Sequence, residues 1–156
     1  MTTVLMLTLL LALSPSQACK SVYADSTPDA DGYVQMGGAL IGVLDGRQYA
    51  IDHLCKGATH KLLLQVSTGS DAVGNPLWKT LDQVVIPTRG DKFFFAFGES
   101  VCRRGTSYDP ELVVIAADAD HEFLPALEVW RANRATGRFE TVSRQGISCL
   151  NEGFGT

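Results

Sequence analysis

Residues 33–54 read YVQMGGALIGVLDGRQYAIDHL, two apolar runs joined by Asp45-Gly46. Asp-Gly between such runs is a strong β-hairpin signal, because a two-residue turn needs the positive φ angles that these residues tolerate. The sequence therefore predicts strands at 33–44 and 47–54, paired antiparallel across a tight turn.

The second run also fits a short helix. Ile51, Leu54 and Cys55 have the helical spacing i, i+3, i+4, whereas Tyr49, Ile51, His53 and Cys55 alternate as one face of a strand. We favour the strand, because Asp-Gly after an apolar run is a weak helix start. On a strand, Asp52 and His53 point to opposite faces.

The rest of the chain continues this pattern of short apolar runs separated by Gly, Pro, Asp and Asn. Further strands are predicted at 61–68, 77–86, 92–98, 112–117, 126–132 and 138–143, with a second hairpin turn at 133–137. The 156 residues fit one domain, which we place at 33–156. The predicted fold is all-β, mainly antiparallel: a small disulfide-stabilised sandwich or barrel.

The N-terminus has the features of a secretory signal peptide. Residues 1–18 carry no charged side chain, 4–13 is an apolar run, and the small residues Ser16 and Ala18 precede Cys19. We predict cleavage before Cys19, an extended lead-in at 19–32, and export to the periplasm or the medium. The absence of an Asn-x-Ser/Thr acceptor favours a bacterial source.

Four cysteines, Cys19, Cys55, Cys102 and Cys149, close two disulfides in an oxidising compartment. Three connectivities are open. The alternative for Cys19 is a lipid anchor to the envelope, which would leave one thiol unpaired. The last three cysteines are spaced by 47 residues, and this spacing suggests an internal repeat of turn, aromatic-bearing strand and cysteine.

Charge is distributed in two blocks. The net charge of −4 and the pI near 5.3 argue against a nucleic-acid binder, which needs clustered cations. Residues 107–128 hold six acidic side chains and no Lys or Arg, and the next segment is basic. Such blocks solvate a surface, or they steer a partner of opposite charge.

The sequence offers few patterns with catalytic or metal-binding chemistry. Asp118, Asp120 and Glu122 are weak candidate ligands for Ca²⁺, because the segment lacks the glycine and terminal glutamate of an EF-hand loop. A hydrolase would need His121 clustered with Asp118 or Glu122 in a cleft. We predict no cofactor and no transmembrane segment.

We therefore predict an exported, non-catalytic binding protein, such as an inhibitor or immunity protein that binds a secreted hydrolase or toxin. The alternatives are a structural or lipid-anchored envelope component and a small secreted hydrolase. Interfaces favour aromatic and arginine anchors, and an acidic loop suits a cationic partner. The candidate contact residues are Asp118, Asp120, Glu122, Trp130, Arg131 and Arg134.

Overall fold

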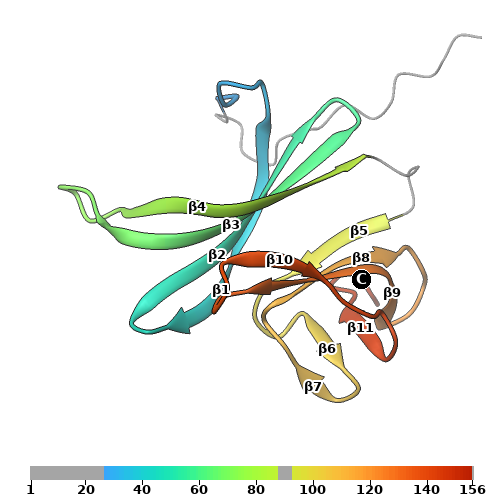
Figure 1. Ribbon diagram of the computed structural model, residues 1–156. Coiled ribbons are helices and arrows are strands. Elements are labelled where there is room, and N and C mark those ends of the chain that lie inside the picture. The colour runs from blue at the N-terminus through green and yellow to red at the C-terminus, as the bar shows by residue number, and fades with distance from the viewer. Residues whose placement is uncertain (1–26, 88–92, 156) are drawn as a thin grey trace, which may run out of the picture.

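The computed structural model describes residues 27–87 and 93–155, and this part of the chain is all-β, with two antiparallel sheets (Figure 1). In the first sheet each strand pairs with the next along the chain, in the order β1-β2-β3-β4. Its strands are β1 (Val34–Leu44), β2 (Arg47–Lys56), β3 (Thr59–Ser70) and β4 (Pro76–Pro87).

The second sheet is built around one long strand, β9. On one side β9 pairs with β8, and on the other side its two ends pair with β11 and β10. The order is β5-β8-β9-β11-β6-β7, with β10 attached to β9. Its strands are β5 (Phe93–Phe97), β6 (Cys102–Arg104), β7 (Ser107–Tyr108), β8 (Leu112–Ala117), β9 (Phe123–Asn133), β10 (Arg138–Thr141) and β11 (Ile147–Leu150).

The hairpin predicted at the start of the domain is confirmed. Asp45 and Gly46 have φ angles of 51° and 74°, and Leu44 pairs with Arg47 across the turn. Positive φ at both central residues is the type I′ geometry, whose twist matches that of the flanking strands. The helical alternative for the second run is wrong, because β2 is a strand throughout.

Eight predicted strands have counterparts in the structure, and the hairpin turn at 133–137 is present between β9 and β10. The sequence analysis missed β6, β7 and β11, which have two to four residues each, too few to show an alternating pattern. Residue 92, the predicted start of one strand, lies outside the described residues. Of the three cysteines with the 47-residue spacing, Cys102 and Cys149 lie on β6 and β11, each in the strand after the aromatic-bearing one. Cys55 lies on β2.

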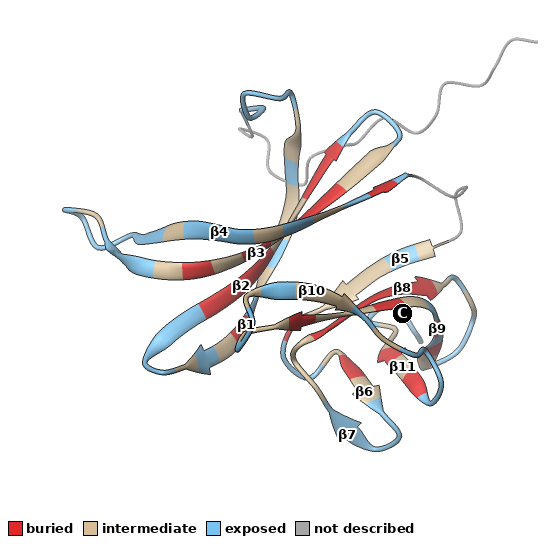
Figure 2. Ribbon diagram, viewed as in Figure 1, coloured by how far each residue is buried: buried red, intermediate tan, exposed pale blue. Residues whose placement is uncertain are grey.

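Two apolar cores lie on opposite faces of β8, and Figure 2 shows β8 as one of the buried strands of the second sheet. Val113 and Ile115 belong to the core between the sheets, together with Ile51, Leu62 and other side chains of the first sheet. Leu112, Val114 and Ala116 alternate with them and face a second core enclosed by the second sheet. Because successive side chains of a strand point to opposite faces, one apolar run serves both cores.

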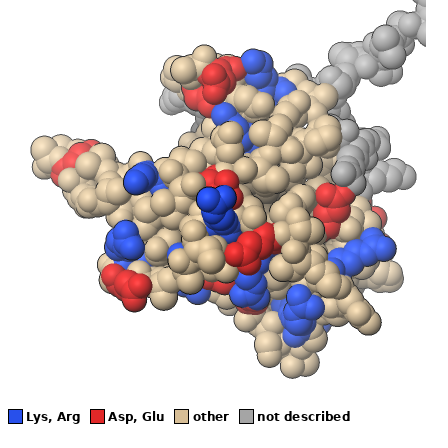
Figure 3. Space-filling model, viewed as in Figure 1, with Lys and Arg blue, Asp and Glu red and all other residues tan. Residues whose placement is uncertain are grey.

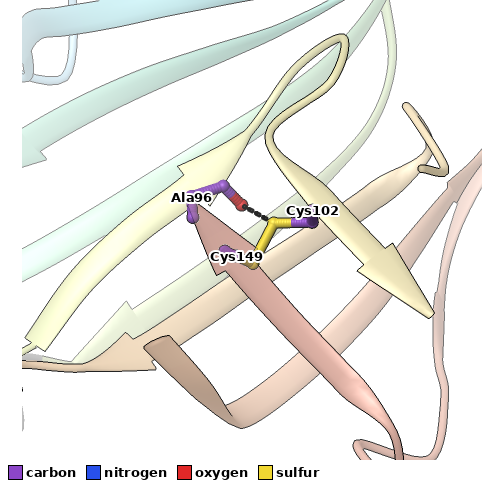
Figure 4. The surroundings of a disulfide bond; sticks show 3 residues. All are labelled: Ala96, Cys102 and Cys149. Atoms are coloured by element: carbon purple, nitrogen blue, oxygen red, sulfur yellow. Dashed lines mark hydrogen bonds between the residues drawn. A yellow bond between two sulfur atoms is a disulfide. The ribbon is translucent and has the colours of Figure 1, made fainter. Parts of the chain in front are cut away.

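A disulfide joins Cys102 of β6 to Cys149 of β11, directly opposite each other in the ladder (Figure 4). Both residues are fully buried, and the Cys102 sulfur lies 3.5 Å from the carbonyl oxygen of Ala96. Bridging cysteines 47 positions apart contributes about 4 kcal/mol by restricting the unfolded chain. Cys55 is disulfide-bonded as well, and Cys19 lies outside the described residues. The buried bond fits a protein of an oxidising compartment.

Residues 29–33, the end of the predicted lead-in, form a hydrogen-bonded turn. The Asp29 carboxylate accepts from the backbone N–H groups of Asp31 and Tyr33. Lys61 of β3 is only 7% exposed. Its Nζ lies 3.1 Å from Asp29 Oδ2 and 3.9 Å from the centre of the Tyr33 ring. The turn therefore closes over a lysine that would otherwise be a buried, unpaired charge.

The predicted signal peptide, residues 1–18, falls outside the described residues. Within the residues that the structure describes, no helix has the length and apolar character needed to cross a membrane.

Candidate functional site

Asp118, Asp120 and Glu122 lie on the connection between β8 and β9, which we call the acidic loop (residues 118–122). All three are exposed. Asn151 holds the loop backbone in place, since its side-chain amide donates to the carbonyl oxygens of Ala119 and His121. The loop therefore presents its carboxylates to solvent from an anchored backbone.

The geometry of the acidic loop does not support the weak calcium candidate. Among residues 27–87 and 93–155, no three His, Cys, Asp or Glu side chains gather as a group that could hold a metal ion. His121 is also exposed, and neither of the two surface hollows described below is lined by His121, Asp118 or Glu122.

Arg131 and Arg134, predicted as partner contacts, form ion pairs with carboxylates of the same molecule. Arg131 donates to Asp109 and to Glu111, the latter at 2.9 Å, and Arg134 Nε donates to Glu111 Oε1 at 2.8 Å. Figure 3 shows basic and acidic side chains side by side over the middle of this face. A partner that used these guanidinium groups would first have to break three ion pairs.

Glu111 is the centre of this network. Burial raises the pKa of its carboxyl, but the hydrogen bonds from Arg134 and the charges of Arg134 and Arg131 outweigh burial and leave the pKa below its ordinary value. Arg134 Nη1 also donates to the carbonyl oxygen of Val43 on β1, at 3.3 Å. The network therefore ties the β9–β10 hairpin to the first sheet.

Close approach at that point requires glycine. A Cβ on Gly42 would lie 2.8 Å from Arg134 Nη1, and Gly42 has a φ of 101°. A larger residue would strain the backbone at this φ and push the guanidinium away from its position.

The predicted contact residues do not form one patch. Glu122 precedes β9, and Trp130 lies near its other end, eight residues or about 26 Å along an extended strand. The acidic loop and the arginine network therefore mark opposite ends of the same strand.

Trp130 lies beside a surface groove, which we call the β9–β10 groove. It has a volume of about 290 Å³ and is lined by Leu127, Glu128, Val129, Trp130, Thr141, Val142 and Arg144. Trp130 is half-buried against the core between the sheets, and the neighbouring Leu127 is 42% exposed. Sequence reasoning selected Trp130 but missed the β10 side, although the 133–137 turn already implies the pairing of Trp130 with Thr141.

A pair of histidines between the sheets also escaped the sequence analysis. His53 Nε2 and His60 Nδ1 are 2.9 Å apart, so a single proton is shared on the line between them. Phe93 and Phe95 of β5 pack against the pair. Burial, with a smaller contribution from His60, lowers the pKa of His53 to about 4, and burial also lowers the pKa of His60.

Asp52 points to the opposite face of β2 from His53, as predicted. Its Oδ1 accepts a hydrogen bond from Gln35 Nε2 at 2.8 Å. Burial raises the pKa of Asp52 above its ordinary value, and the Gln35 hydrogen bond offsets part of that rise. Asp52 and His53 therefore do not act together.

Comparison of the chain with protein-family models, with curated proteins and with solved structures gave no match.

Proposed function

We propose that the chain is an exported binding protein that holds a protein partner against the β9–β10 groove, as an inhibitor or immunity protein does with a secreted hydrolase or toxin. The observation that carries the proposal is the pairing of a half-buried tryptophan with an exposed leucine along an open groove. Interface hot spots favour tryptophan, set in a packed centre and surrounded by residues that exclude water.

The groove is held on a rigid support. The Glu111 network fixes the hairpin that carries Trp130, and the Cys102–Cys149 bond closes the adjoining core. A preorganised surface loses little conformational entropy when it binds, which favours a protein partner of high affinity.

The acidic loop has a separate part in this proposal. Its exposed carboxylates raise the rate at which a cationic partner approaches, whereas groove contacts determine how slowly that partner leaves. Export is supported by the uncharged apolar N-terminus and by the disulfide.

The first step of the test is to capture partners from an envelope extract on the immobilised, oxidised chain. The second step measures the association and dissociation rates of a captured partner with variants of the chain. Leu127→Lys places a charge in the groove without touching the core, and we expect it to raise the dissociation rate at least tenfold. Leu77→Lys is the matched control, because Leu77 is 48% exposed on β4, in the other sheet, against 42% for Leu127. Equal dissociation rates for the two variants would show that the partner does not bind at the β9–β10 groove.

The acidic loop is tested with Asp118→Asn plus Asp120→Asn. We expect slower association, with a weaker dependence on salt, and an unchanged dissociation rate. Asp45→Asn is the control, since Asn also tolerates the left-handed backbone of that exposed turn. An association rate that the loop substitutions leave unchanged would show that the carboxylates do not steer the partner.

A further inference from the structure

The outer face of the first sheet, turned away from both cores, carries a hollow of about 310 Å³, which we call the outer hollow. The ladder explains why it forms. Leu40, Ala50 and Gln65 stand opposite one another on β1, β2 and β3, so a methyl group lies between two long side chains. Its lining residues are Gln35, Gly38, Ala39, Leu40, Ala50, Ile51, Asp52, Gln65 and Trp78.

Trp78 reaches this face because of a β-bulge. Ile86 and Val84 of β4 face the core, but the register shifts between Leu64 and Gln65, so that Trp78 pairs with Ser67 on the outside. The indole therefore forms a wall of the outer hollow, beside Gln65, instead of packing into the sandwich.

The polar groups of the outer hollow are planar and few. Gln35 donates to Asp52 Oδ1 at 2.8 Å, which fixes a carboxylate and an amide relative to each other. Gln65 Nε2 makes a hydrogen bond of 3.5 Å to Thr80 Oγ1, at the long limit for such a bond. These amide and carboxylate groups offer hydrogen-bond donors and acceptors to a ligand that carries several hydroxyl groups.

These features select a class of ligand. An indole face packs against the C–H face of a sugar ring, and planar amides and carboxylates bind its hydroxyl groups. No Lys or Arg lines the hollow to hold an anion, and an apolar ligand would make no use of the polar side chains Gln35, Asp52 and Gln65. The volume is at the lower end of the range of about 300–1,000 Å³ for small-molecule sites, which suits a short oligosaccharide segment.

We propose that the outer hollow binds one or two units of a neutral glycan, with Trp78 as the stacking surface and Asp52, Gln35 and Gln65 as hydroxyl ligands. This site is separate from the β9–β10 groove, and it does not depend on the function proposed for that groove. It would hold the exported chain on an envelope or extracellular polysaccharide.

Tryptophan fluorescence tests the proposal directly. The sequence has two tryptophans, so Trp130→Phe leaves Trp78 as the single reporter in the oxidised chain. We expect saturable changes in Trp78 emission on titration with at least one of cellotetraose, chitotetraose and maltotetraose. No saturable change with any of the three, or binding only to anionic polygalacturonate, would overturn the proposal.

Two variants locate the site. Ala50→Leu fills the outer hollow without removing a polar group, and Trp78→Ala removes the stacking surface; calorimetry should show at least tenfold weaker binding for each. Tyr108→Ala is the matched control, because Tyr108 is an exposed aromatic residue on β7 of the other sheet. Thermal unfolding confirms that each variant is folded. If Ala50→Leu does not fold, Trp78→Ala alone tests the site. A folded variant that binds the glycan with undiminished affinity would show that the outer hollow is not the binding site.

Discussion

Acidification should destabilise the protein through the buried pair of His53 and His60. His53 Nε2 and His60 Nδ1 share one proton at 2.9 Å, and two phenylalanine rings pack around them. Burial removes the water that would solvate a charged His53 ring, and protonating both rings would also place two like charges in contact. The folded state therefore resists protonation that the unfolded chain accepts, and the pKa of His53 falls from 6.5 to about 4.

The sign and the size of the effect follow from that shift. A histidine with a lowered pKa in the folded state stabilises fully above its unfolded pKa, and that stability is lost as the pH falls toward the folded pKa. The full loss for His53 is about 3 kcal/mol by pH 4, of which about 2 kcal/mol has been lost by pH 5. Burial lowers the pKa of His60 too, so His60 acts in the same direction.

Urea unfolding at pH 7.5 and pH 5 measures the loss. His53→Gln keeps a group able to hydrogen-bond His60 but cannot titrate, so this variant should lose about 2 kcal/mol less than the natural chain between the two pH values. His121→Gln is the matched control, because His121 is exposed on the acidic loop. The raised pKa of Asp52 acts in the opposite direction and cancels in the comparison.

Parallel losses in the natural chain and in His53→Gln, within about 0.5 kcal/mol, would refute the reasoning, since the titration of His53 could not then be responsible. The lowered pKa values of Asp29, Asp71 and Glu111 do not interfere. The stability that they contribute is lost only as the pH falls below their unfolded values near 4.

Three further predictions concern the contacts that hold the fold together. Glu111→Ala leaves two arginines without their shared carboxylate and should lower the free energy of unfolding by about 2 kcal/mol in urea, with Glu111→Gln near half that loss; a change below about 0.5 kcal/mol would contradict the network. Replacing both Cys102 and Cys149 by Ala should lower it by about 4 kcal/mol under oxidising conditions, and a loss below 1 kcal/mol would contradict the loop-closure argument. Because Cys102 and Cys149 bond each other, Cys19 is the cysteine left in the sequence for Cys55, and non-reducing peptide mapping should find them joined; a lipidated Cys19 would refute this pairing.

Local sequence signals predicted the first sheet well. Asp45-Gly46 determined the turn, and the alternation from Tyr49 to Cys55 gave the correct faces of β2, because turn chemistry and side-chain period are properties of neighbouring residues. The position of Trp78 could not be predicted in this way. One bulge reverses the faces along β4, and a bulge leaves little trace in an apolar and polar pattern.

The charge blocks show what long-range pairing adds. In the sequence, Glu111 belongs to an acidic segment and Arg131 to the basic segment that follows it. In the structure Arg131 pairs with Leu112 across the β8–β9 ladder, so the blocks meet and neutralise each other in part. Within the acidic segment, the loop at the turn between those strands keeps its three carboxylates exposed to solvent.

The strand β8 couples the unfolding of the two apolar cores. Since its alternate side chains complete two different cores, neither core can open while the other stays intact. The domain should therefore melt as one unit, with the amides of β8 among the last to exchange with solvent. A change in volume at Val113 or Val114 would be transmitted through a single backbone to the core on the opposite face.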